Sequence, residues 1–220
     1  NVPGIGGQRY VDRHRQRGKM LVRERIENLI DPNTPFLELS PLAAWGTEDP
    51  IGVGIASGIG TIEGVECLIT GTDMTVRGGS ANPTTWKKSQ RFTEIAKENR
   101  LPVINLNESA GADLPRQADL FIQGGASFRD LTQLSQMGIP TITMAFGPNT
   151  AGGAYTPGTS DYTVFVKDRA TAYLGGPPLV KMAIGEEVDE ESLGGADMHS
   201  RTSGLSDFLA QDEMDALRIT

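Results

Sequence analysis

The feature that most constrains the fold is an apolar run that ends in a glycine-rich segment. Residues 139–145 are expected to form a buried strand, and the sequence FGPNTAGGAY at 146–155 places adjacent glycines where a helix can begin. Paired backbone N–H groups without Cβ cover at a strand end are suited to hold a developing oxyanion. A glycine-rich turn can instead serve only close packing of two elements, and for one such loop alone we favour this simpler interpretation.

Two more loops of small residues follow strand patterns earlier in the chain. Asp73–Val76 is expected to end a strand before loop 77–80, and Leu101–Leu106 to be a strand before loop 107–113. Asn82-Pro83 is a typical helix start, because proline is favoured in the first turn. Since functional loops tend to gather at one edge of a sheet, three such loops together favour a site over a set of packing turns.

The rest of the chain completes an α/β pattern of mixed ββα units. A helix is predicted over Arg9–Leu29 and ends at residues 31–35. Residues 51–61 and 65–70 form a predicted β-hairpin around Glu63-Gly64. Asp113 is expected to cap a helix opened by Leu114-Pro115. Further predicted elements are helices at about 126–137, 178–184 and 214–219, and strands at 162–166 and 171–174.

Composition and charge exclude several classes of function. The 220 residues are enough for one large domain or two small ones. No apolar stretch is long enough to span a bilayer, and no signal-peptide core is present. The single Cys67 excludes an internal disulfide framework, indicates a reducing compartment and, with only two histidines, leaves no Cys/His zinc finger. A net charge of −8 with few aromatic residues argues against nucleic-acid binding.

The N-terminal part of the chain is basic, although the whole chain is acidic. Its cations are Arg9, Arg13, Arg15, Arg17, Lys19, Arg23 and Arg25. They are suited to face an anionic ligand such as a nucleotide phosphate. We favour the alternative, in which they form a solvated helix face and pair with other subunits or with solvent.

No side-chain constellation for catalysis stands out. Ser109 is not in a nucleophile elbow, and neither His14 nor His199 is near it in sequence. No Walker loop, dinucleotide-binding fingerprint or biotin-attachment sequence is present. Glu186-Glu187 and Glu190-Glu191 are expected to be a solvated acidic stretch. Backbone electrostatics remains, because glycine loops around an oxygen that gains negative charge suit enolate chemistry on a thioester.

A series of collinear motifs covers nearly the whole chain. They are Leu21–Ile26 with Leu29–Pro32, Val76–Gly79, Glu108–Asp119, Thr150–Tyr155, Leu174–Lys181, Gly185–Glu187 and Leu193–His199. In these segments the chain resembles the carboxyltransferase β subunit of the biotin-dependent acyl-CoA carboxylases. The most similar subgroup is the methylcrotonyl-CoA or geranyl-CoA carboxylase type. Only the N-terminal domain of that subunit is matched.

The resemblance implies an α/β, crotonase-like (ClpP/crotonase) spiral of ββα units. It divides the chain into an N-terminal helical segment, 1–35, and an acyl-CoA-binding domain, 36–220. The implied activity moves a carboxyl group from carboxybiotin, held on a separate carrier subunit or domain, to an acyl-CoA, and no metal is expected in this chain. The expected partners are the C-terminal carboxyltransferase domain of a neighbouring subunit, a biotin carboxylase or biotin carrier subunit, and further copies in a homo-oligomer. No nucleic acid or membrane is expected, and the expected compartment is the bacterial cytoplasm or the mitochondrial matrix.

The resemblance also assigns the site. Gly152 and Gly153 match the oxyanion pair for the thioester enolate, and Ala110 and Gly111 are expected to supply N–H groups from the opposite wall of the acyl pocket. The expected substrate-binding residues are Ser109, Ala112, Arg116, Gly78, Gly79, Ala151, Ala154, Gly176 and Pro177. No general base is assigned to this chain, because the ureido nitrogen of biotin is expected to take the substrate proton.

Two departures from the family pattern bear on specificity. Ala110 stands where the family usually has glycine, and its Cβ narrows the pocket or excludes positive φ. The segment between Phe121 and Ile139 is shorter than in the subgroup and lacks its charged, aromatic insert.

Two other functions stay open at this point. A crotonase-type enoyl-CoA hydratase, isomerase or decarboxylase needs a side-chain acid or base, and Glu108 and Asp113 are the nearby carboxylates. A non-catalytic assembly module of a carboxylase complex needs neither.

Overall fold

A mixed sheet lies at the centre of the computed structural model, which describes residues 7–220, with only the backbone of Leu114, Gln117, Phe121 and Gln123. Its strands are β1 (Leu37–Glu38), β2 (Ile55–Ile62), β3 (Val65–Thr72), β4 (Val103–Ser109), β5 (Thr141–Thr150), β6 (Tyr162–Val166), β7 (Thr171–Tyr173) and β8 (Phe208–Ala210). They are ordered β1-β2-β3-β4-β5-β6-β8, with β7 paired to β5. The pairs β1–β2 and β2–β3 are antiparallel, and the later pairs are parallel.

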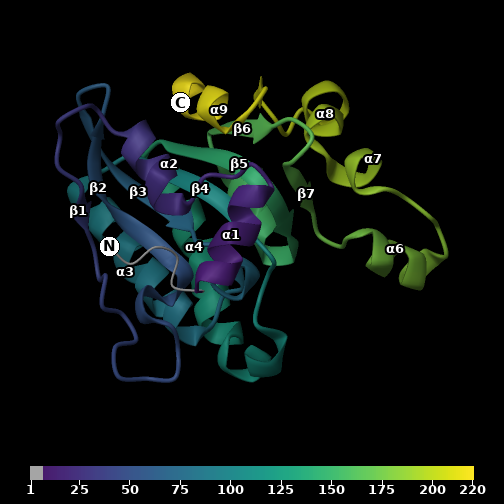
Figure 1. Cartoon of the computed structure of the whole chain (residues 1–220), viewed down its shortest axis with the longest axis horizontal. Coiled ribbons are helices and arrows are strands. Elements are labelled where there is room, and N and C mark those ends of the chain that lie inside the picture. Colours follow the sequence, from purple (N-terminus) through teal and green to yellow (C-terminus); the bar gives the residue numbers. More distant parts are fainter. Residues whose placement is uncertain (1–6) are drawn as a thin grey trace.

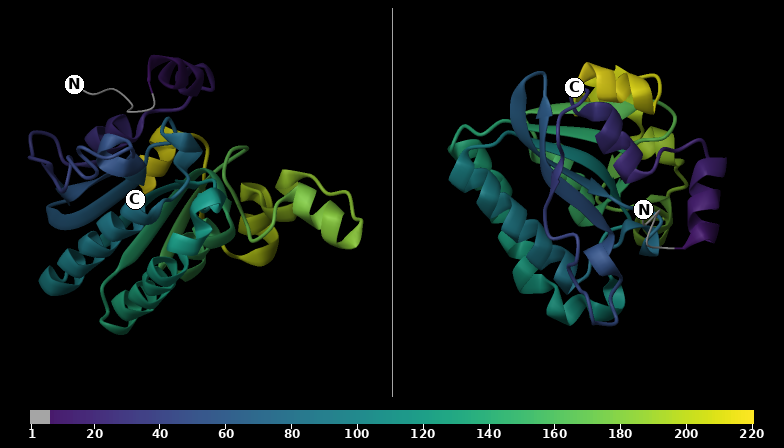
Figure 2. Two further views of the ribbon diagram at one scale, coloured as in Figure 1. Left: turned by 90° about the horizontal axis from the view of Figure 1, so that it is seen from below. Right: turned by 60° about the vertical axis from the view of Figure 1, so that its left-hand side comes forward.

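Helices cover both faces of this sheet. The connections from β3 to β4 and from β4 to β5 contain α3 (Pro83–Asn99) and α4 (Phe121–Gln136), which lie side by side on one face (Figure 1, Figure 2). The other face is covered by α2 (Val22–Leu29) and α9 (Glu213–Ile219). The remaining helices are α1 (Gln8–Gln16), α5 (Tyr155–Thr159), α6 (Pro177–Ile184), α7 (Glu190–Gly194) and α8 (Ala196–Met198). In the described part of the chain, no helix is long and apolar enough to cross a bilayer.

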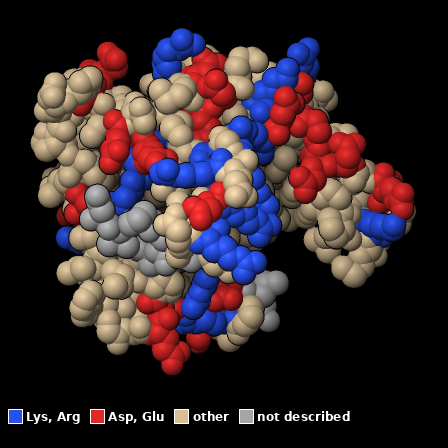
Figure 3. Space-filling view, viewed as in Figure 1, with Lys and Arg blue, Asp and Glu red and all other residues tan. Residues whose placement is uncertain are grey.

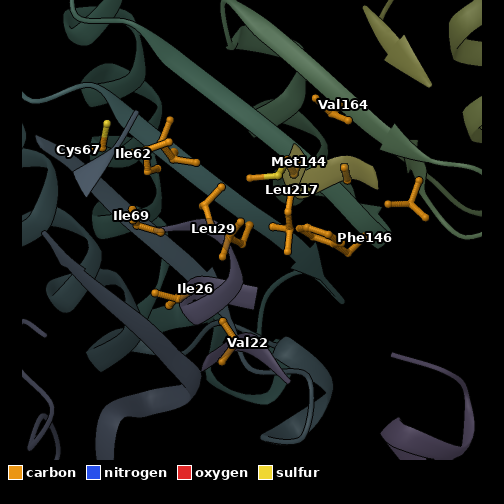
Figure 4. Packing of buried hydrophobic residues seen from close by; sticks show 14 of the residues in the cluster. Val22, Ile26, Leu29, Ile62, Cys67, Ile69, Met144, Phe146, Val164 and Leu217 are labelled. Atoms are coloured by element: carbon orange, nitrogen blue, oxygen red, sulfur yellow. The ribbon is translucent and has the colours of Figure 1, made fainter. Parts of the chain in front are cut away.

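The alternation of side chains along β4 divides the core into two layers. Ile104 and Leu106 point to the side of α2 and α9, where they join the cluster that contains Ile26, Met144 and Phe146 (Figure 4). Val103 points to the opposite side and packs with Phe92 of α3 and Leu134 of α4. The two odd-numbered positions that follow on β4, Asn105 and Asn107, are polar, so the α3/α4 side of the sheet becomes less apolar towards the end of the strand.

The predicted helix over Arg9–Leu29 is wrong as a single element. Helix α1 ends at Gln16 and α2 begins at Val22. Gly18 has φ +67 between them, a conformation that stops a helix and that glycine adopts at no steric cost. The break allows α2 to dock on the sheet while α1 takes another direction (Figure 1).

Three predicted strand limits are also wrong. Asp73–Val76 is a turn after β3, because the Asp73 carboxylate accepts hydrogen bonds from the Thr75 N–H and hydroxyl. Strand β4 continues to Ser109, so the expected loop 107–113 begins later, and β5 continues through Thr150.

Most of the other predicted elements are confirmed, with shifts at their ends. The hairpin is β2 and β3, but residues 51–54 form a separate turn before β2. Helix α3 begins at Pro83 with Asn82 as its cap, whereas α4 begins at Phe121, several residues earlier than expected. A short 3₁₀ helix, 114–119, occupies the position of the helix expected after Leu114-Pro115. The strands at 162–166 and 171–173 and the helices at 177–184 and 213–219 are present.

Candidate functional site

The three small-residue loops meet at one pocket of about 470 Å³. The first loop contributes Gly79 and Ser80, followed by the adjacent Ala81. The second contributes Ser109, Gly111 and Ala112, and the third Ala151, Gly152 and Gly153. The loops follow β3, β4 and β5, which are neighbouring parallel strands, so the carboxyl ends of these strands bring them together. The expectation that the loops gather at one sheet edge is confirmed.

Backbone hydrogen bonds fix the second loop against the first. The Ala81 N–H donates to the Gly111 carbonyl at 3.0 Å, and the Asp113 N–H donates to the Ala81 carbonyl at 2.9 Å. The Gly111 N–H donates to the Ser109 hydroxyl at 3.0 Å. Gly111 has φ +90, which an L-residue rarely adopts, so glycine is needed at this turn.

The third loop packs directly on Ser109. A Cβ at Gly153 would lie 2.7 Å from the Ser109 Cβ and 2.9 Å from its hydroxyl oxygen, too close for any other residue. At Gly152 the nearest atom to such a Cβ is the Phe128 ring at 3.6 Å, an ordinary contact. Asn107 completes the junction, since its side-chain amide donates to the Gly153 carbonyl at 3.2 Å.

The glycine pair lies in the first turn of a helical segment. A 3₁₀ turn, 151–154, starts where β5 ends and continues into α5. The first turn of a helix carries N–H groups that the helix itself does not pair. Ala151 has φ +53, so the chain leaves β5 through a left-handed residue that turns the glycines towards the pocket-lining loops. Chemically, this arrangement is suited to bind an oxygen that carries partial negative charge.

Arginines and aspartates form a cluster beside the first two loops. The Arg116 guanidinium lies 2.8 Å from the Asp49 carboxylate. Arg77 lies 3.5 Å from Asp49 and 3.6 Å from Asp113. Both arginine side chains are more than one third exposed, so they are available at the surface next to the pocket. Arg116 itself does not line the pocket.

Glu108 lies on the opposite face of the sheet from the pocket. Its carboxylate is fully buried and lies 2.7 Å from the Arg25 guanidinium and 2.9 Å from the Lys19 amine. Burial raises the pKa of Glu108, but Arg25 and Lys19 outweigh it and hold the pKa below its ordinary value. Arg25 also pairs with Glu213 of α9 at 2.9 Å. Glu108 is therefore a structural anion, and a hydratase that needs it as acid or base gains no support.

Apart from Arg116, the expected site residues divide into three groups. Those that line the pocket are Gly79, Ser109, Gly111, Ala112, Ala151, Gly152 and Gly153. Gly78, Ala110 and Ala154 are sequence neighbours of lining residues but do not themselves line it. Gly176 and Pro177 lie at the start of α6, in an arm that projects from the body of the molecule and does not line the pocket (Figure 1, Figure 2).

Sequence reasoning missed the two helical walls of the pocket. Helix α3 contributes Thr85, Ser89, Phe92 and Thr93, and α4 contributes Gly124, Gly125, Phe128 and Leu131. One signal was available, because Thr85, Ser89 and Thr93 recur every four residues and place small polar side chains on one helix face. The glycines of α4 carried no periodic signal.

The basic N-terminal segment is only partly available to a ligand. Figure 3 shows Lys and Arg gathered on the face that carries α1, where Arg9, Arg13, Arg15 and Arg17 are exposed. Arg15 pairs with Glu24, and Arg23 pairs with Glu38 at 2.6 Å. With Lys19 and Arg25 in the buried cluster, four of the seven cations have carboxylate partners within the chain. These pairs favour the interpretation as a paired and solvated surface.

The chain is similar to proteins of known type along nearly its whole length. The family model described as carboxyl transferase domain matches residues 13–220. A probable biotin-dependent acyl-coenzyme A carboxylase beta2 subunit from Mycobacterium tuberculosis is 61% identical over 97% of this chain and 40% of its own length. The 3-methylcrotonyl-coenzyme A carboxylase beta1 subunit of the same organism is 50% identical over 97% of this chain and 41% of its own length.

Solved structures give the same result. The Pseudomonas aeruginosa geranyl-CoA carboxylase beta subunit superposes with a TM-score of 0.88 at 43% identity, over 94% of this chain and 39% of that one. The transcarboxylase 12S structure, described as a hexamer assembly with methylmalonyl-coenzyme A bound, superposes with a TM-score of 0.90 at 32% identity, over 97% of this chain and 43% of that one. The chain thus spans about two fifths of the curated relatives it matches.

Proposed function

The chain belongs to the carboxyl transferase domain family, and from this we propose that it forms the acyl-CoA-binding half of a biotin-dependent carboxyltransferase. Its fold is the predicted crotonase-like α/β arrangement, shared with the carboxyltransferase structures. The observation that carries the proposal is the contact of Gly153 with Ser109 at the pocket. This contact requires glycine at position 153 and brings the third loop to the same space as the second loop.

In this function the chain binds the thioester and stabilises its enolate. The N–H groups of Gly152 and Gly153 are proposed to donate to the thioester oxygen from one wall, and those of Ala110 and Gly111 from the other. The Gly111 N–H donates to the Ser109 hydroxyl in the structure, so its part in the proposal requires it to exchange this hydroxyl for the substrate oxygen. Loss of one such donor typically costs about 3 kcal/mol of transition-state stabilisation. When bound, carboxybiotin on its carrier supplies the carboxyl group that is transferred. No side chain of this chain needs to act as nucleophile, which agrees with the pairing of Glu108 on the far face.

The substrate-binding residues are proposed around the same space. Ser109, Ala112, Gly79 and Ala151 line the pocket. They are proposed to contact the acyl or pantetheine part of the substrate. Arg116 is proposed to approach CoA from the surface, where its side chain is 38% exposed. The remaining assignments, which depend on the resemblance alone, are Gly78, Ala154, Gly176 and Pro177.

The domain division is proposed in the same terms. Residues 36–220 form the acyl-CoA-binding domain, and residues 1–35 form a helical segment, of which 1–6 lie outside the described residues. Helix α2 docks this segment on the sheet, and Arg25 joins it to Glu108 and Glu213. The segment therefore contributes to the stability of the domain rather than to its pocket.

The proposed assembly is a homo-oligomer with biotin-carrying partners. Relatives are subunits of acyl-CoA carboxylases, and one related structure is described as a hexamer assembly. We call residues 174–187, which contain α6, the α6 arm. It exposes Leu174, Leu179, Met182 and Ile184, and such apolar surface is typical of contacts between proteins. We assign this arm to a contact with a second copy. The C-terminal domain of a neighbouring subunit and a biotin carboxylase or carrier subunit complete the complex.

The proposed compartment follows the relatives, some of which are bacterial and some mitochondrial. In a bacterium it is the cytoplasm, and in a eukaryote the mitochondrial matrix. Neither a nucleic acid nor a membrane is a proposed partner.

Carboxylation by the full-length protein tests the function. With its biotin-carrying partner, the protein is expected to fix labelled bicarbonate in an acyl-CoA-dependent reaction. Gly152→Val is expected to lower kcat/KM by at least 100-fold, because branched methyl groups would fill the space at the oxyanion position. Gly158→Val is the matched control, since Gly158 is exposed in α5 and outside the pocket.

The outcomes separate catalysis from assembly. A non-catalytic assembly module would support carboxylation equally well with Gly152→Val and with the parent protein. Absence of acyl-CoA binding by the intact complex, measured by titration calorimetry, would overturn the proposed function altogether.

A further inference from the structure

Lys88 of α3 carries a buried charge whose hydrogen-bond partners are backbone carbonyls. The residue is only 5% exposed. Its ammonium donates to the Gly52 carbonyl at 3.1 Å and to the Ile55 carbonyl at 2.7 Å, and it lies 5.6 Å from the centroid of the Phe92 ring. A buried charge is costly unless its partners compensate for lost hydration, so these carbonyls take the place of water around the ammonium.

The charged groups that act on Lys88 from a distance oppose each other. Glu38 of β1 raises the pKa of Lys88 and Arg23 of α2 lowers it, while burial has the largest effect and lowers this pKa to about 8. Glu38 and Arg23 also form an ion pair with each other at 2.6 Å. At neutral pH Lys88 is therefore still mostly charged, and its direct contacts in the described part of the chain are with the backbone.

These carbonyls belong to a turn of three left-handed residues. Gly52, Val53 and Gly54 have φ of +77, +50 and +71. Glycine adopts this conformation at no steric cost, whereas a β-branched residue such as valine rarely does. A strained conformation of this kind persists only where surrounding contacts hold it. The turn therefore depends on groups outside it.

All four carbonyls of residues 52–55 accept hydrogen bonds from outside the turn. Lys88 donates to the first and the last of them. The Thr85 hydroxyl donates to the second at 3.3 Å, and the Asp73 N–H donates to the third at 2.8 Å. Lys88 thus joins both ends of the strained segment, and its bonds are strengthened by its charge.

The same turn forms part of the pocket wall. Val53 and Gly54 line the pocket, whereas Lys88 does not. Gly54 lies close to Val76, which also lines the pocket, since a Cβ at Gly54 would be 3.3 Å from the Val76 side chain. A return of Val53 to an ordinary negative φ would therefore change the shape of this wall.

We propose that Lys88 is a positioning residue, whose ammonium holds residues 52–54 in the left-handed conformation and so keeps this wall of the pocket in the shape that binds acyl-CoA. The inference rests on the proposed function, because that function places the substrate in the pocket. Lys88 acts through the turn and not on the reacting atoms. Removal of its charge is therefore expected to weaken substrate binding more than it slows the chemical step.

Steady-state kinetics of the full-length protein with its biotin partner test the proposal, with butyryl-CoA and octanoyl-CoA as probes. Lys88→Met keeps the aliphatic stem and removes the ammonium. It is expected to raise KM by about 10-fold or more, while kcat changes by less than about 3-fold. Lys87→Met is the matched control, because Lys87 is the neighbouring lysine on α3 and is exposed, and it leaves KM unchanged.

A double variant tests whether Lys88 acts through the turn. Val53→Gly removes the steric cost of the left-handed conformation, so in this background Lys88→Met is expected to raise KM by less than about 3-fold. Lys88→Gln, which keeps two N–H donors without the charge, is expected to give an intermediate KM and replaces Lys88→Met if that variant does not fold. An unchanged KM in Lys88→Met, or an equal rise in both backgrounds, would overturn the proposal.

Amide hydrogen exchange of the same complexes gives a readout that does not depend on turnover. The Gly52 N–H donates to the Ala43 carbonyl and the Val53 N–H to the Pro50 carbonyl, so both amides report on the turn. In Lys88→Met, residues 50–56 are expected to exchange about 10-fold faster, with β4 and β5 unchanged. Equal acceleration across the sheet would show a purely structural role and would overturn the proposal.

Failure of the proposed function would look different. A parent protein that binds neither thioester in titration calorimetry would contradict the acyl-CoA function. Exchange at residues 50–56 would still show whether Lys88 holds the turn, because this measurement requires no substrate.

Discussion

Gly153 combines a steric and a chemical requirement in one residue. Its backbone is proposed to donate to the thioester oxygen, and its missing side chain lets Ser109 approach. The two requirements can be tested separately. The steric requirement comes from the Ser109 side chain, which can itself be replaced by a smaller one.

Gly153→Ala is expected to lower carboxylation at least 10-fold, since its Cβ would displace Ser109 and the N–H groups with it. The double variant Gly153→Ala/Ser109→Gly is expected to regain part of the activity. Steady-state kinetics on both variants checks this, with Gly152→Ala as a milder comparison because its Cβ would make only an ordinary contact with Phe128. No recovery in the double variant would argue against the steric account.

Glu108→Gln is expected to destabilise the protein by about 3–5 kcal/mol, because Arg25 and Lys19 then lose a buried anionic partner. The folded pKa of Glu108 lies below its ordinary value, so its stabilisation is present above that value and disappears as pH falls through the folded pKa. The parent should therefore lose stability more steeply than Glu108→Gln below about pH 4.5.

Urea unfolding between pH 3 and pH 8 measures this difference. Glu187→Gln serves as the control, because Glu187 is largely exposed and its ion pair within the described residues is with exposed Lys181. Equal stability of the parent and Glu108→Gln at neutral pH would show that the buried cluster does not stabilise the fold.

At the scale of elements, the start of α3 is specified locally. The Thr85 N–H donates to the Asn82 side chain, and the Asn82 N–H donates to the Thr85 hydroxyl. This reciprocal pair satisfies N–H groups that the helix leaves unpaired. It also holds the first turn of α3 beside the pocket, which Thr85 lines.

Asn82→Ala is expected to lower the free energy of unfolding by about 1 kcal/mol through loss of this cap. Chemical denaturation compares it with Asn99→Ala at the other end of the helix, where the side chain is exposed and the effect should be smaller. An Asn82→Ala variant as stable as the parent would show that the Asn82 cap does not stabilise α3.

The elements that sequence predicted well are those with local signals. Asn82-Pro83 identified the start of α3, and the glycines at 152 and 153 identified the third loop. The predicted strand at 101–106 stopped short of Ser109, so the alternation that sends Glu108 to the opposite face was missed. The helical walls of the pocket come from the packing of α3 beside α4, and no local pattern specified that contact.

At the scale of the molecule, the α6 arm is the part with least internal support. It stands away from the sheet (Figure 2), and Met182 is 78% exposed. Burial of side chains within the chain therefore contributes little to the folding of this arm. The proposed contact with a second copy would instead bury these side chains between the two copies.

Met182→Glu is expected to change the free energy of unfolding by less than about 0.5 kcal/mol while it weakens self-association, because a charge would enter an apolar contact. Sedimentation velocity of the full-length protein measures the association. Met214→Glu, at an exposed methionine on α9, is the matched control. Unchanged association in Met182→Glu would place the contact elsewhere.

The buried pair of Arg25 and Glu213 also has a consequence for biosynthesis. The two residues are 188 positions apart in sequence, and a ribosome that adds about 5–20 residues per second needs roughly 10–40 s to pass from one to the other. Until then the nascent α2 carries a guanidinium that lacks one of its anions, so docking of α2 is unfavourable. Helix α2 is therefore synthesised before the hairpin and the strand–helix units but docks after them.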